Sequence, residues 1–167
     1  MRLQNVGCGA IVTACTLTVT ACTPTPLAAA GAERGRVAAV IDGDTIRVDT
    51  ATGTVRVRII GINTPEVGRD GQSSECYAEQ ARDYLDQLAY GRTVDLSPDP
   101  SQADTDKYGR LLRHVYLDGV NVALTEIQAG VGAEYTYDKP YNGQSDYRAA
   151  QAAAQAAGRG LWGSCTP

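Results

Sequence analysis

The stretch Thr54-Val55-Arg56-Val57-Arg58-Ile59-Ile60 decides how this chain folds. Its valines and Ile59 alternate with Arg56, Arg58 and Ile60, which is the two-residue period of a half-buried β-strand. Two runs rich in β-branched residues precede it, at residues 36–42 and 45–49, and they are separated by breaks at Gly43 and residues 50–53. The pattern predicts a meander of three strands.

Beyond this meander, residues 93–96 and 111–117 predict a fourth and a fifth strand, the latter closed by Asp118-Gly119. Helical spacing predicts three helices, from Ser73 or Ser74 to about residue 89, over 121–128 and over 145–157. The first of them would bury the face made by Tyr77, Ala78, Ala81, Tyr84, Leu85 and Leu88. The pattern alone indicates an α+β fold, and five strands with two or three helices fit a small OB-type barrel.

Three polar motifs lie between these elements: DGDT at 42–45, RIIGINTPE at 58–66 and DKYGR at 106–110. Hard cations prefer oxygen ligands, and carboxylates supply them best. Arginine presents a planar fork that matches phosphate oxygens. Together the motifs predict an enzyme that cleaves phosphodiester bonds.

From about Arg36 to Trp162 the chain resembles the staphylococcal nuclease (thermonuclease) family. The matching stretches are VIDGDTIRV, VRVRIIGINTPE, DKYGR and GRGLW, in the family's order and at roughly its spacing. The resemblance implies a five-stranded OB-type barrel. It also implies a calcium-dependent endonuclease that acts on DNA and RNA with little sequence preference and leaves 3′-phosphate ends.

The resemblance also implies a metal site. Asp44 resembles the family's metal-binding aspartate, with Asp42 as nearby support, although an aspartate in a turn also caps the backbone. Thr64 would offer its backbone carbonyl. Asn63 stands where the family's best-known members carry a second metal-binding aspartate, and its amide oxygen can ligate calcium but brings no charge.

Five further residues match the family's catalytic and substrate-binding positions. Arg58 and Arg110 match the two phosphate-binding arginines, which would neutralise charge on a five-coordinate phosphorus. Glu66 resembles the glutamate that acts on the attacking water, either as general base or by orienting it. Lys107 and Tyr108 resemble contacts to a terminal phosphate and sugar.

Tyr135 and Tyr137 resemble the tyrosine pair that lines the family's nucleotide pocket, although core packing explains tyrosines at such positions equally well. Tyr141 is a spare candidate. His114, within LLRHVYL, is expected to be a structural or surface histidine of a strand, because one histidine without a partner forms no catalytic dyad.

Residues 1–22 fit an export signal, residues 23–34 a flexible tether, and residues 35–165 the folded domain. Val19-Thr20-Ala21-Cys22 resembles a lipobox, so that a lipid on Cys22 would hold the protein to the outer face of the membrane. Cleavage after Ala28-Ala29-Ala30 would instead release a secreted protein. A buried amino-terminal helix fits poorly, because the segment is rich in threonine and lacks a polar face.

The cysteines and the net charge indicate where the protein works and what it binds. Cys76 and Cys165 are the pair left outside the export segment, and an even pair in an oxidising compartment predicts one disulfide. The formal net charge of −4 is unusual for a partner of nucleic acid. It favours a local basic cleft on an acidic body, and the alternative is that tight nonspecific binding to DNA is not the role of this protein. We expect a monomer. The alternative function is a catalytically weak or inactive nuclease-like module that binds nucleic acid or protein.

Overall fold

Three antiparallel strands open the fold in the computed structural model, which describes residues 33–165. β1 (Glu33–Asp42) pairs with β2 (Thr45–Thr50), and β2 pairs with β3 (Gly53–Ile59). The meander predicted from the alternating pattern is therefore confirmed. The predictions for residues 1–22, for most of the tether and for Cys22 lie outside the described residues.

Two further strands close this meander into a barrel. β5 (Thr93–Ser97) pairs antiparallel with β1 and with β6 (Leu111–Leu117). β6 then pairs in parallel with β3, with Val57 opposite Leu111. The result is the predicted five-stranded OB-type barrel. Three short strands were not predicted: β4 (Ile62–Asn63), which pairs with β8 (Ala133–Glu134), and β7 (Val120–Asn121), which extends the sheet beside β6.

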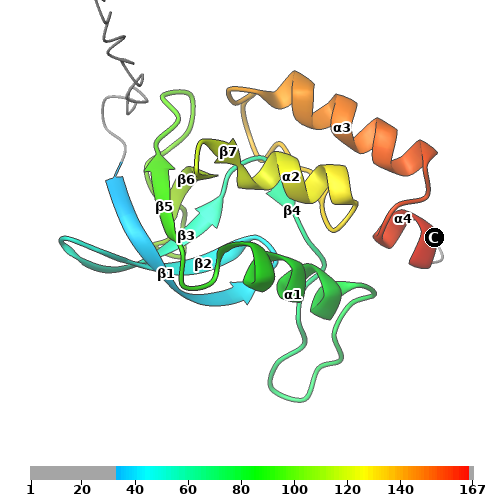
Figure 1. Cartoon of the computed structure of the whole chain (residues 1–167), viewed down its shortest axis with the longest axis horizontal. Helices are drawn as coiled ribbons and strands as arrows, with labels where there is room; N and C mark the ends of the chain where they lie inside the picture. Colours follow the sequence, from blue (N-terminus) through cyan, green and yellow to red (C-terminus); the bar gives the residue numbers. More distant parts are fainter. Residues whose placement is uncertain (1–32, 166–167) are drawn as a thin grey trace, which may run out of the picture.

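Figure 1 shows the helices packed around the barrel. α1 (Ala78–Ala89) packs against β1, and α2 (Val122–Ala129) packs against β6 and α3 (Gln144–Ala156). The short α4 (Leu161–Ser164) ends the described chain. Among the helices of residues 33–165, none has the length and hydrophobicity of a membrane span.

The start of α1 corrects the sequence prediction, because the helix begins at Ala78 and not beside Ser73 or Ser74. The Ser74 hydroxyl accepts a hydrogen bond from Gly68 N and donates to Glu79 Oε1, so it ties the preceding loop together and caps no helix. Tyr77 precedes α1 with φ 72°, a left-handed conformation that breaks the helical path. The apolar face is otherwise as predicted for Ala78, Ala81 and Leu85, which are fully buried.

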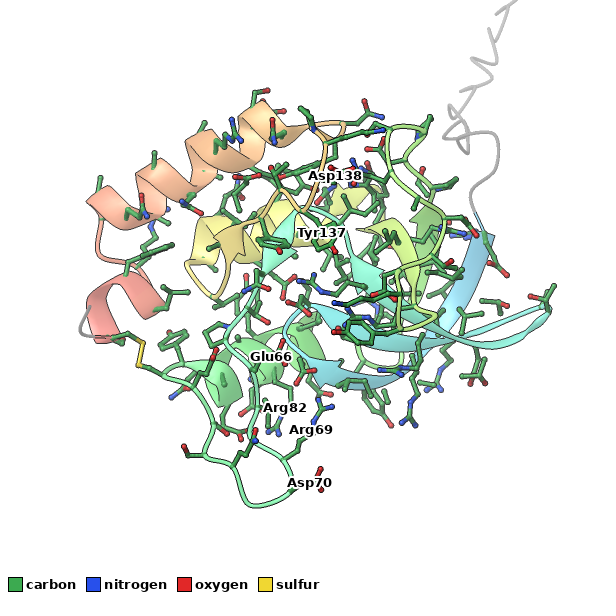
Figure 2. All side chains as sticks on the ribbon, turned by 180° about the vertical axis from the view of Figure 1, so that it is seen from behind. Glu66, Arg69, Asp70, Arg82, Tyr137 and Asp138 are labelled. Carbon is green, nitrogen blue, oxygen red and sulfur yellow. A yellow bond between two sulfur atoms is a disulfide. The ribbon has the colours of Figure 1, made fainter. Side chains whose placement is uncertain are left out.

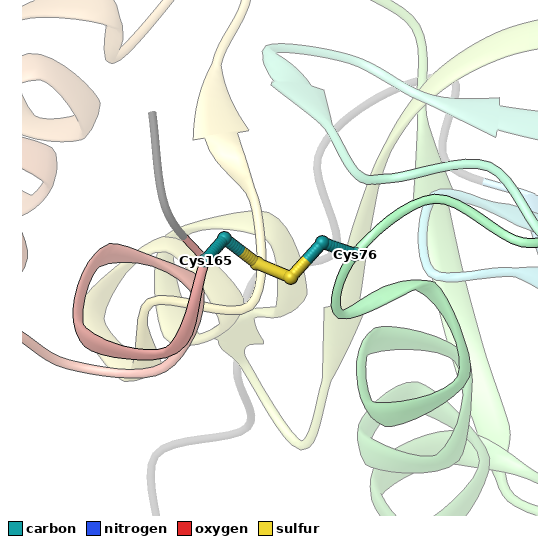
Figure 3. The surroundings of a disulfide bond; sticks show 2 residues. All are labelled: Cys76 and Cys165. Atoms are coloured by element: carbon teal, nitrogen blue, oxygen red, sulfur yellow. A yellow bond between two sulfur atoms is a disulfide. The ribbon is translucent and has the colours of Figure 1, made fainter.

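A disulfide joins the loop before α1 to the end of the chain (Figure 3). Cys76 and Cys165 are 89 residues apart in sequence, and their Cα atoms are 5.9 Å apart. Cys165 directly follows α4. The bond therefore fixes the far end of the loop that follows β4 to the carboxyl-terminal helices.

Candidate active site

A cleft of about 820 Å³ opens beside the barrel, where β3 and β4 face the loops before β6 and after β8. It brings together nine of the residues singled out in the sequence, from four separate segments. They are Arg58, Asn63, Glu66, Lys107, Tyr108, Arg110, Tyr135, Tyr137 and Tyr141. Asp44 and Thr64 do not line the cleft but lie buried behind it, each 1% exposed.

Arg58 is held at the floor of this cleft by four acceptors. Its Nη2 lies 3.0 Å from Asp44 Oδ2 and donates to Asn63 Oδ1 at 3.1 Å. Its Nη1 donates to the backbone carbonyls of Ile59 at 2.9 Å and Ile62 at 2.7 Å. The chain supplies these carbonyls because it turns back on itself directly after β3, at Gly61 with φ +86°. The guanidinium is thus fixed in one orientation before any substrate arrives.

Asp44 owes its position to the turn between β1 and β2. Its Oδ1 accepts from the Thr45 hydroxyl and its Oδ2 from Thr64 N, both at 3.0 Å. Gly43 lets this turn pack closely, since a Cβ there would come within 2.9 Å of Thr64 and Ala81 side-chain atoms. The turn thereby holds the DGDT motif against the RIIGINTPE motif.

Asp42, two residues earlier, faces a different partner. Its carboxylate lies 2.7 Å from Arg69 Nη2, on the loop between β4 and α1. β1 ends at Asp42, and Asp44 lies in the turn before β2, so the two aspartates do not share the face that one regular strand would give them. Asp42 therefore acts near the site through its charge and through Arg69.

Arg110 is positioned by its own motif. Its Nε donates to Asp106 Oδ2 at 2.7 Å, and its backbone N–H donates to Asp106 Oδ1 at 3.0 Å. Burial opposes the ionisation of Asp106, but these bonds and one from Tyr108 N outweigh it and lower the pKa of the carboxyl. Arg110 Nη1 also donates to the Thr45 hydroxyl at 3.3 Å. Because Arg58 is the partner of Thr45 in the β2–β3 pairing, both arginines lie at the start of β2.

Glu66 lies on the loop after Pro65, near Arg69 and with Asp70 at the outer end of the loop (Figure 2). The backbone there is held by Glu75, whose carboxylate accepts from Glu66 N at 2.9 Å and whose N–H donates to Glu66 O at 3.0 Å. Within the described residues the Glu66 carboxyl itself has no hydrogen bond or ion pair, and it lines the cleft. It is free to contact a ligand there.

The pKa of Glu66 is raised above its ordinary value. Desolvation is the largest cause, followed by the charges of Asp44 and Asp42, while Arg58 and Arg69 act in the opposite direction. A carboxyl with a raised pKa is a better proton acceptor once ionised.

Aromatic rings form the outer parts of the cleft. Tyr135 and Tyr137 are 43% and 76% exposed, with ring centroids 6.4 Å apart, so core packing does not explain this pair. Tyr108 is 64% exposed, and both Arg110 and Lys107 approach its ring, at 5.3 and 5.0 Å from the centroid. Tyr141, by contrast, is buried and donates to Gly61 O at 3.2 Å.

His114 has the structural role expected for a strand histidine. It is 4% exposed, and its Nε2 lies 2.9 Å from Asp99 Oδ2, which also accepts from Asn142 N. Burial disfavours the charged form of Asp99. Hydrogen bonds from Asn142, His114 and Ser101 outweigh this effect and lower the pKa of Asp99 to about 2. This cluster ties the loop after β5 to the loop before α3, and these loops form two walls of the cleft.

Several residues of this region were not predicted from the sequence, including four with charged or amide side chains. Arg69 reaches Asp42 from a loop without periodicity, and Gln102, Asp138 and Lys139 line the cleft from two further loops. Gln102 donates to the carbonyl oxygen of Lys139 at 3.0 Å. No local pattern in the sequence points to these residues, because their contacts connect distant loops.

Comparison with known proteins gives matches to one family. The model of the family described as "Staphylococcal nuclease homologue" matches residues 56–164. An endonuclease of Escherichia coli O157:H7, described as uncharacterized, is 35% identical over 134 residues, which cover 80% of this chain and 79% of that protein. The thermonuclease of Staphylococcus hyicus is 30% identical over 127 residues, covering 76% of this chain and 74% of that enzyme. With the closed barrel and the cleft in place, these matches show that the chain belongs to the staphylococcal nuclease family.

Proposed function

We propose that this protein is an exported, metal-dependent endonuclease that hydrolyses phosphodiester bonds of DNA and RNA and leaves 3′-phosphate ends. One observation carries the proposal: two fixed arginines and a free carboxyl with a raised pKa line the same cleft. The endonuclease names of the relatives support the same reaction class.

The chain's own residues supply most of the chemistry. Ionised Glu66 takes a proton from the attacking water or orients it. As water adds to phosphorus, Arg58 and Arg110 donate to the phosphoryl oxygens, where negative charge accumulates. Carboxylates and carbonyls already hold both guanidinium groups at the cleft. The bond to the 5′ oxygen breaks and that oxygen takes up a proton from solvent, which leaves a 3′-phosphate and a 5′-hydroxyl.

The residues present fit a hard divalent cation. The available donors are oxygens, and Asp44 Oδ2 and Asn63 Oδ1 already converge on one cationic nitrogen of Arg58. Asp44, Asn63 and the backbone carbonyl of Thr64 would hold the ion, with Asp42 adding charge nearby. We propose calcium, or another divalent cation, which would polarise a phosphoryl oxygen when bound.

The aromatic and basic rim suits a polynucleotide. Tyr135 and Tyr137 present exposed faces on which a base can stack, a contact that contributes about 1–3 kcal/mol. Lys107 and Tyr108 would contact a neighbouring phosphate and sugar. Since stacking and phosphate contacts read no base edge, we expect broad sequence tolerance.

The proposed setting is outside the cytoplasm. The Cys76–Cys165 disulfide supports an oxidising compartment. A lipid anchor on Cys22, or release by cleavage further on, remains a proposal from the sequence, as does a monomeric state.

A cleavage assay tests the proposal against the alternative of a binding module. Plasmid DNA and a structured RNA are incubated with the purified protein and calcium, and separately with a chelator. We expect cleavage of both substrates with calcium and none with the chelator. The Glu66→Gln variant should lose about a hundredfold or more in rate, while Glu79→Gln on α1 serves as the matched control. Binding without any cleavage by the wild type would support the module instead.

A further inference from the structure

Two exposed arginines stand directly opposite each other on the outer face of the barrel. Arg47 of β2 pairs in register with Arg56 of β3. Each is exposed in a strand whose alternate residues are buried, so both side chains point away from the core. Like charges in such cross-strand pairs destabilise a sheet. A carboxylate partner would relieve this repulsion.

No such partner compensates them among residues 33–165. Neither guanidinium takes part in an ion pair or side-chain hydrogen bond there, in contrast to Arg34, Arg69, Arg82, Arg92, Arg110 and Arg113. The neighbour of Arg47 on β1 is Ala39, which carries no charge. On a chain with a net charge of −4, this uncompensated pair is unusual.

The arginine pair is continuous with the cleft. Side chains two residues apart on a strand share a face, so Arg56 lies on the same face of β3 as Arg58. The adjacent cross-strand pair on this face is Thr45 with Arg58, and Thr45 accepts a hydrogen bond from Arg110. The parallel register, with Val57 opposite Leu111, also brings the end of the DKYGR motif alongside Arg56.

We infer that Arg47 and Arg56 form a second phosphate-binding site, one nucleotide away from the cleft, for the backbone of a single-stranded nucleic acid. This inference rests on the proposed nuclease function. Two residues of a strand span about 7 Å, which is similar to the length of one nucleotide in an extended strand. Arginine forks bind phosphate in a bidentate manner without reading sequence. The next pair on this face, Asp49 with Thr54, brings a carboxylate and ends the basic track.

Salt-dependent binding tests the inference directly. A fluorescent single-stranded DNA dodecamer is titrated with protein in chelator, where it is not cleaved, across a series of salt concentrations. The double variant Arg47→Ala with Arg56→Ala should bind about tenfold more weakly at low salt, and the slope of log K against log salt should fall by about 1.4, or 0.7 per lost contact. Lysines at both positions should keep most of the slope, because they keep the charge. The matched control, Arg34→Ala with Arg92→Ala, removes the same net charge from ion-paired arginines and should keep the wild-type slope.

Cleavage kinetics separate this inference from the proposed function. With calcium present, kcat/KM is measured on the dodecamer and on a dinucleoside monophosphate, which has a single phosphate. The alanine double variant should lose activity selectively on the dodecamer. An unchanged salt slope, an equal loss on both substrates, or the same slope change in the control would overturn the inference while the nuclease function stands. A wild type that cleaves neither substrate but still needs both arginines for binding would reject the proposed function alone.

Discussion

Arg58 forms a nearly buried ion pair with Asp44, with 3.0 Å between Nη2 and Oδ2 and side chains only 13% and 2% exposed. The same nitrogen donates to Asn63 Oδ1. One phosphate-binding candidate is therefore oriented by the two side chains proposed to hold the cation. The charge on this small set of groups should control both cation affinity and substrate binding.

Replacing Asn63 by aspartate should tighten cation binding. The change adds one negative charge at ligand distance, and such a charge interacts with a cation by several kcal/mol even at an effective dielectric of about 20. Half-maximal activity should then occur at lower free calcium, while Asn63→Ala should raise the requirement. Calorimetric titration of calcium gives a second readout that is independent of turnover. A common midpoint for all three proteins would place Asn63 outside the metal shell.

Arg110 should depend on Asp106 for its position. Arg110→Ala should lower kcat/KM by about a hundredfold or more, because a donor to the phosphoryl oxygens is lost. Asp106→Asn keeps the guanidinium but removes the ion pair at 2.7 Å, and we expect a smaller loss of about tenfold. Arg82→Ala, an ion-paired arginine on α1, is the control and should retain activity. Full activity of a folded Arg110→Ala variant would contradict the assignment.

The disulfide should stabilise the fold without taking part in catalysis. Because Cys76 and Cys165 are 89 residues apart, replacing both by serine should lower the free energy of unfolding by about 2–4 kcal/mol. Thermal denaturation should show the loss, and activity at low temperature should stay near the wild-type level. Thiol titration of the unreduced, unfolded exported protein should find neither thiol free. Two reactive thiols would mean that the bond does not form.

Glu126 should make stability depend on pH. It is fully buried on α2, and neither carboxyl oxygen has a hydrogen-bond partner within the described residues. Burial raises its pKa well above the ordinary value, and the charge of Asp44 adds to this while Arg58 opposes it. Since the unfolded chain releases this proton at lower pH than the folded chain, stability is greatest below the unfolded pKa of about 4.3 and falls as pH rises towards the folded pKa.

Glu126→Leu should therefore stabilise the protein, and by more at about pH 8 than at about pH 5. We expect a gain of about 1–3 kcal/mol in the free energy of unfolding at neutral pH, since a buried carboxyl without a partner is removed. Urea denaturation at several pH values measures the gain, with the exposed Glu79→Leu as control. A gain independent of pH would show that Glu126 does not titrate in this range.

Much of the fold was determined by local sequence. Alternation at Val55, Val57 and Ile59 predicts a strand because side chains in a strand change face at every residue. The Asp106–Arg110 pair also lies within one short motif, so its spacing carries the information. The start of α1 was predicted wrongly because Ser74 has the local chemistry of a cap, whereas the tertiary structure uses its hydroxyl to bridge Gly68 and Glu79.

Tertiary structure alone decided the relationships across the barrel. Arg69 with Asp42 and His114 with Asp99 are 27 and 15 residues apart, and no periodicity links such positions. The opposition of Arg47 and Arg56 depends on strand register, and the burial of Glu126 depends on how α2 packs against its neighbours. Local patterns report backbone conformation, because that is set by neighbours in sequence. The partner of a charged side chain is set by chain closure and packing, which bring distant segments together.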